Sequence, residues 1–164
     1  MTTQWRTLLG ATMLAILAQT AGVGAGSAAS AATPAAAVHP VSGLPVIPLT
    51  ITSGRKPHVF RVELASTSDQ QAQGLMFRTS MAPDEGMIFP MRPPRLANFW
   101  MHNTVLPLDI IFIGADHRVM TIAANAVPYD DTNIPSGGIA SGVLELNAGR
   151  AAQLGIKVGD KVSW

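Results

Sequence analysis

Hydrophobic and polar residues alternate with a period of two in several short segments, the pattern of half-buried β-strands. The clearest case is "HVFRVELA", where Phe60, Val62 and Leu64 alternate with Arg61 and Glu63. The preceding segment "VIPLTI" is also apolar, and "TSGRKP" between the two holds the glycine and proline of a turn. The pattern predicts two strands joined by a tight connection, beginning near Val46.

A second pair of strands is predicted further along the chain. "LDIIFI" is apolar except for Asp109, and the short turn "GADH" separates it from "RVMTIAANAV". Because a buried carboxylate is costly unless its oxygens are paired, we expect Asp109 to bond the loop at 102–106 or an arginine, above all Arg78. "IASGVLELNAG" and "KVGDKVSW" predict two more strands, and "VPYDDTNIPSGG" has the composition of an exposed loop.

Two short helices are expected. Thr67 and Gln70 have the spacing of a capping box, and Gly74 is a natural stop. Asn147 is the expected N-cap of a second helix, "AGRAAQLG", which ends at Gly155.

The many short strands predict a mainly-β domain, a compact sandwich or barrel with two short helices. Prolines at 90, 93 and 94 exclude a long helix in the middle of the chain. The residues expected to form the core are Phe60, Leu64, Ile88, Phe89, Ile111, Phe112, Leu144 and Leu146.

The first 31 residues differ from the rest. One arginine, an apolar run "LLGATMLAILA" and a stretch of small residues form the three parts of a secretory signal peptide. We therefore expect residues 1–31 to be a cleaved leader, 32–45 a linker and 46–164 a single domain. The protein would then be periplasmic or secreted, without membrane attachment after cleavage.

Charge limits the partners. The chain has 11 Lys and Arg against 10 Asp and Glu, and Arg6 is the only charge in the leader, which leaves 10 against 10. This balance argues against nucleic acid as a partner. We expect a monomer. There is no cysteine, so its domain must rely on its apolar core without disulfides.

Six segments together carry a resemblance: "VELAST", "QGLMFRTSM", "DEGMIFPM", "NFWMHNTVLPLDIIFI", "VLELNAG" and "LGIKVGDKV". In this order, from about position 59 to 162, they resemble domain-of-unknown-function family 192. The resemblance implies a compact, jelly-roll-like β domain, often exported, and no established activity. The family commonly has Lys where this chain has His102, so a role for His102 would be particular to this protein.

Four side chains are the predicted ligand-binding residues: Arg78, Trp100, Asn103 and Asp109. A tryptophan beside polar and charged groups suits a small polar molecule, a sugar or a peptide. Asn103, with Thr104, also suits a structural role, since both side chains fix turns by bonding nearby backbone. Asp109 likewise has a structural alternative, on an outer face or bracing a turn.

Two other chemistries are open. Thioethers and imidazole suit copper(I), and His102 follows a cluster of five methionines whose simpler role is core packing: Met76, Met81, Met87, Met91 and Met101. Acid–base catalysis would join His102 to one of four carboxylates, Asp84, Glu85, Asp109 or Glu145. Candidate nucleophiles are Ser80, Ser136 and Ser141, and none has nucleophile-elbow flanks.

Paired metal-ligand spacing is lacking among His39, His58, His102 and His117, so no metal or cofactor is expected. The favoured function is non-catalytic: an exported β domain that binds a small ligand or peptide, or assists an envelope protein. A periplasmic hydrolase or a copper-binding protein is the alternative.

Overall fold

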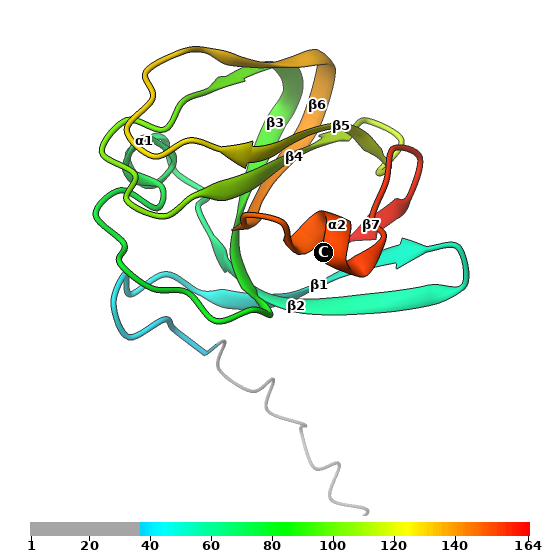
Figure 1. Cartoon of the computed structure of the whole chain (residues 1–164), viewed down its shortest axis with the longest axis horizontal. Helices are drawn as coiled ribbons and strands as arrows, with labels where there is room; N and C mark the ends of the chain where they lie inside the picture. Colours follow the sequence, from blue (N-terminus) through cyan, green and yellow to red (C-terminus); the bar gives the residue numbers. More distant parts are fainter. Residues whose placement is uncertain (1–36) are drawn as a thin grey trace, which may run out of the picture. The chain divides into compact units, whose positions relative to one another are not determined.

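A computed structural model describes residues 37–164, which form seven strands and two short helices (Figure 1). The elements, in chain order, are β1 (Val46–Ser53), β2 (Lys56–Leu64), α1 (Ser68–Gln73), β3 (Glu85–Phe99), β4 (Leu108–Gly114), β5 (Val119–Ala126), β6 (Ile134–Asn147), α2 (Arg150–Leu154) and β7 (Lys161–Ser163). Neither helix in this part of the chain has the length and apolar character that a membrane crossing requires.

All seven strands belong to one sheet, in the order β5-β4-β6-β3-β2-β1-β7. Neighbours are antiparallel except β2 and β3, which are parallel. The two ends of the sheet meet where Val119 donates to the Asp160 carbonyl at 2.9 Å and Val162 donates to the His117 carbonyl at 2.8 Å. The sheet therefore curls on itself, with α2 between β4 and the β1–β2 hairpin (Figure 1). The predicted mainly-β architecture with two short helices is confirmed.

β4 is buried along its whole length, as its continuous apolar run predicted. Leu108, Ile110 and Phe112 enter one hydrophobic cluster, which includes Phe89 and the core methionines, while Ile111 and Ile113 enter another, with β1, β2 and α2. Seven of the eight predicted core residues are at most 1% exposed, and Leu64 packs against the second of these clusters while partly buried. Because both faces of β4 are buried, its sequence does not alternate between apolar and polar residues.

The helix termini confirm one prediction and correct another. Thr67 and Gln70 form the capping box of α1, and Gly74 is its C-cap. Asn147 does not cap α2, because its amide donates to the carbonyls of Met81 and Ala82, both at 3.0 Å. The N-cap position of α2 is Gly149, which has no side chain to offer.

Two connecting segments also differ from expectation. The last part of the predicted linker is structured, since Val38 and Pro45 form an isolated bridge. Positions 134–138, expected in a loop, begin β6 because they pair with the end of β3, for example Ile134 with Phe99. The predicted leader and residues 32–36 lie outside the described residues.

Candidate functional site

Asp109 is fully buried, and backbone amides satisfy its carboxylate. Oδ1 accepts from the N–H groups of Asn125 at 2.9 Å and Gly149 at 3.0 Å, and Oδ2 accepts from Ala151 at 2.8 Å. The predicted tie to Arg78 or to the 102–106 loop is wrong. Asp109 instead caps the N-terminus of α2, the role expected of Asn147. It accepts hydrogen bonds from N–H groups at the start of α2 that have no partner within the helix. Its observed contacts are structural.

We expect Asp109→Asn to lower the free energy of unfolding by about 1.5–3 kcal/mol, the range for hydrogen bonds to a charged group. The amide is similar in shape but turns one acceptor into a donor, so one of the three N–H groups loses its partner. Urea unfolding of both proteins measures the difference. Asp84→Asn is the control, since that side chain is exposed. A loss for Asp109→Asn no larger than that for Asp84→Asn would contradict the capping role.

Arg78 pairs with a buried carboxylate, that of Glu63. Nη1 lies 2.9 Å from Glu63 Oε1, Nη2 donates to Oε2 at 3.0 Å, and the two residues are 8% and 3% exposed. Ser42 also donates to the same carboxylate. The pair joins β2, the segment after α1 and the chain before β1, beside a hollow of about 1060 Å³ that Arg78 lines.

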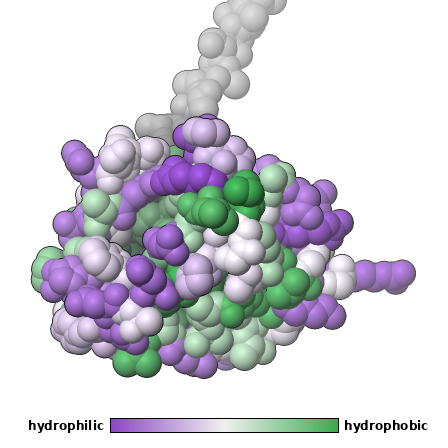
Figure 2. Space-filling model, turned by 90° about the horizontal axis from the view of Figure 1, so that it is seen from above, coloured by the Kyte–Doolittle hydropathy of each residue, from purple (hydrophilic) through white to green (hydrophobic). Residues whose placement is uncertain are grey.

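A different cavity, of about 370 Å³, lies between the end of α1, the second half of β3 and the segment at 100–104. Trp100 lines it and is 50% exposed, so this predicted site residue does face a cavity. Asn103 is not among its lining residues; it has a φ of 50° and its carbonyl accepts from Phe77 N–H at 2.9 Å. Figure 2 shows a hollowed face of the molecule on which hydrophobic residues lie among hydrophilic ones. The four predicted residues therefore do not converge on one site.

Glu145 is the unusual group of this cavity. It is 5% exposed and lines the cavity wall, while its cross-strand neighbours, Met87 on β3 and Ile110 on β4, are both apolar and fully buried. Burial raises the pKa of the Glu145 carboxyl to about 8. No described residue donates a hydrogen bond to this carboxyl to offset the cost. The cavity thus holds a carboxylic acid that is largely protonated at neutral pH and has unused bonding capacity.

The raised pKa of Glu145 predicts a pH dependence of stability. Between pH 4.5 and pH 8 the folded protein holds a proton that the unfolded chain has lost, so its free energy of unfolding should fall as pH rises through this window and level off above it. Glu145→Gln removes the titration and should flatten this component. Urea unfolding of both proteins at pH 5 and pH 8 measures it, and an equal pH dependence in the two would refute the shifted pKa.

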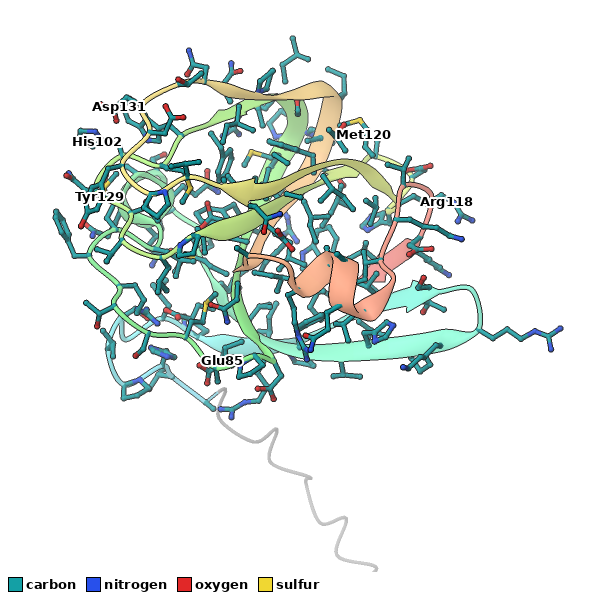
Figure 3. The ribbon with its side chains drawn as sticks, in the orientation of Figure 1. Glu85, His102, Arg118, Met120, Tyr129 and Asp131 are labelled. Carbon is teal, nitrogen blue, oxygen red and sulfur yellow. The ribbon has the colours of Figure 1, made fainter. Side chains whose placement is uncertain are left out.

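His102 lies at the rim of the same cavity. Its Nδ1 is 2.7 Å from Asp131 Oδ1, and its ring lies 5.1 Å from the Trp100 ring, centroid to centroid. Figure 3 shows His102, Tyr129 and Asp131 together at one end of the molecule, away from Arg118 and Met120. The observed partner of His102 is thus Asp131, a residue absent from the four carboxylates considered in the sequence.

Two of the three candidate serines donate to backbone carbonyls, and three of the five clustered methionines lie in the core. Ser136 donates to the Gly138 carbonyl at 2.7 Å and Ser141 to the Gly114 carbonyl at 2.6 Å, while Ser80 is exposed. Core packing is confirmed for Met87, Met91 and Met101, which are at most 3% exposed. Within residues 37–164, no three His, Asp or Glu side chains gather as a metal site would need.

The sequence pattern indicates Glu145 only as a possible acid–base partner of His102. A usable signal was present, because Glu145 interrupts the apolar run "VLEL" as Asp109 interrupts "LDIIFI". Both carboxylates are buried on central strands. They differ in that Asp109 meets three backbone donors and Glu145 meets an open cavity.

A crystal structure of a protein of unknown function from Novosphingobium aromaticivorans DSM 12444 is 63% identical, covers 79% of this chain and 93% of its own, and has a TM-score of 0.78. A "putative transcription regulator" from Sinorhizobium meliloti 1021 is 42% identical, covers 71% of this chain and 91% of its own, and has a TM-score of 0.69. No curated protein matches the chain. The model of family DUF192, described as Uncharacterized ACR, COG1430, matches residues 49–164, and the chain belongs to this family.

Proposed function

We propose that this protein is an exported binding domain that takes up a small, partly apolar molecule in the cavity beside Glu145. The observation that carries the proposal is a buried carboxyl that lines a cavity of about 370 Å³ and has no hydrogen-bond donor among the described residues. Binding sites combine apolar walls with a few polar groups that fix orientation. Phe89, Met91 and Phe99 supply such walls here.

Energetics favour this role over a structural one for Glu145. A buried polar group without a partner costs roughly 1–3 kcal/mol, more if it is charged. Three backbone amides offset that cost for Asp109, whereas no donor among the described residues does so for Glu145, whose desolvation raises its pKa. A ligand with a hydrogen-bonding group would recover it, so the unpaired carboxyl is a source of binding free energy.

A thermal-shift screen with matched variants tests the proposal. Ala72 is an exposed residue of α1 on the cavity wall, so Ala72→Trp should fill the entrance without disturbing the core. Ala152→Trp is the control, on an exposed position of α2 that does not line this cavity. Small molecules that raise the melting temperature of the wild type should do so for Ala152→Trp and fail for Ala72→Trp. Shifts that persist in Ala72→Trp would place binding elsewhere and overturn the proposal.

Export is the other part of the proposal, and the leader sequence supports it. Mass spectrometry of the protein from its native host should find an N-terminus between about Ser30 and Val38, where the small-residue cleavage region lies. Recovery of a chain that still begins at Met1 in the mature fraction would contradict export by cleavage.

A further inference from the structure

The ionisable groups of the cavity wall differ in how they are used. They are Arg95 on β3, His102 after β3 and Glu145 on β6. Arg95 is exposed and its Nη2 donates to Gln71 Oε1 at 3.4 Å, and His102 is joined to Asp131. Both of these basic side chains are exposed or partly exposed and have polar partners, whereas the carboxyl is buried and no described side chain or amide donates to it. The inner polar contact of a bound molecule would therefore be with Glu145.

Aromatic rings line the same cavity. Phe89 and Phe99 meet edge to face with centroids 5.1 Å apart, and Trp100 lies next to Phe99 in the chain. The faces of such rings carry partial negative charge and attract cations, with tryptophan the strongest. A carboxyl and aromatic rings on one cavity wall both favour a positively charged guest.

We infer that the cavity selects organic amines, with the protonated nitrogen against the Glu145 carboxyl and the apolar body among Phe89, Phe99 and Trp100. This inference rests on the proposed function and narrows its ligand class.

Binding of a protonated amine should change the protonation state of Glu145. The empty site holds a neutral carboxylic acid at neutral pH, because its neighbours Met87 and Ile110 do not stabilise the charged form. When an ammonium ion binds, Glu145 gives its proton to solvent and becomes the carboxylate of an ion pair. One proton is released for each amine bound, so the affinity rises with pH until the empty site itself ionises. A neutral ligand releases no proton.

Benzylamine and benzyl alcohol are the matched probes, since they are close in shape and differ in charge. Isothermal titration of the mature protein should give tighter binding of benzylamine at pH 7.5 than at pH 6, by about tenfold or more. Titration in two buffers with different ionisation enthalpies should show close to one proton released. Benzyl alcohol should bind more weakly, with no rise in affinity over this range.

Variants separate this inference from the proposed function. Glu145→Gln resembles the protonated acid and should weaken benzylamine binding at pH 7.5 at least tenfold while leaving benzyl alcohol unchanged. Ala72→Trp should weaken both probes, and Ala152→Trp neither. Benzyl alcohol that binds as tightly as benzylamine, or amine binding independent of pH, would overturn the selection of amines and leave a binding cavity in place. No binding of benzylamine at either pH would also overturn it, and the thermal-shift screen would then decide the proposed function separately.

Discussion

Arg78→Ala is expected to lower the free energy of unfolding by about 3–5 kcal/mol, because it leaves the Glu63 carboxylate buried without its main partner. Glu63 is 3% exposed; its Oε2 accepts a hydrogen bond from Arg78 Nη2, and its Oε1 lies 2.9 Å from Arg78 Nη1. Two other residues approach the same carboxylate but do not replace the guanidinium. Ser42 donates one hydrogen bond from a neutral hydroxyl, and the His39 Nδ1 is 3.7 Å from Glu63 Oε1. Urea unfolding followed by circular dichroism measures the loss.

Two controls isolate the buried pair. Arg55 is an exposed residue of the β1–β2 turn, so Arg55→Ala should change stability by no more than about 0.5 kcal/mol. The double variant Glu63→Met/Arg78→Met removes both charges and should be more stable than Arg78→Ala, because no charge is left unpaired. A loss below about 1 kcal/mol for Arg78→Ala would show that the pair is solvated in solution.

Phe112→Ala is also expected to cost about 3–5 kcal/mol, the range for a large aromatic side chain removed from a core. Phe112 is fully buried in the middle of β4 and meets Phe99 edge to face with centroids 6.0 Å apart. β4 has core on both faces, so its neighbours have little freedom to close the cavity that the substitution creates.

Phe77→Ala is the matched control for this second prediction. Phe77 is 65% exposed and should lose no more than about 0.5 kcal/mol on truncation. Chemical unfolding of the two variants side by side measures both values. Similar losses for Phe112→Ala and Phe77→Ala would contradict the central position of β4.

The fold was largely predictable because its signals are local. The apolar run from Leu108 to Ile113 predicts a buried strand by itself, and Thr67 with Gln70 predicts a helix start within one turn. Asp109 marks the limit of such reasoning. Its burial required partners, but the amides that serve it lie 16, 40 and 42 positions away in the chain. The orientation of distant backbone groups depends on the whole sheet.

The candidate site was less predictable, because it depends on residues that are far apart in the chain. Arg78 and Trp100 were both expected near a ligand, yet one is bound to Glu63 and the other borders a cavity. Glu145 has the same sequence context as Asp109, a carboxylate in an apolar strand. A sequence does not distinguish a carboxylate that meets donors from one that meets a cavity, since that difference lies in which loops cover the strand.

The cavity beside Glu145 is the proposed binding site of this protein. Two-dimensional amide NMR of the protein during titration with a small molecule identified in the thermal-shift screen tests this site directly. The largest shift changes are expected on the cavity wall, at Leu75, Thr104, Glu145 and the indole N–H of Trp100. Changes centred instead on the hollow beside Arg78, at Ser80 and Met81, would contradict it.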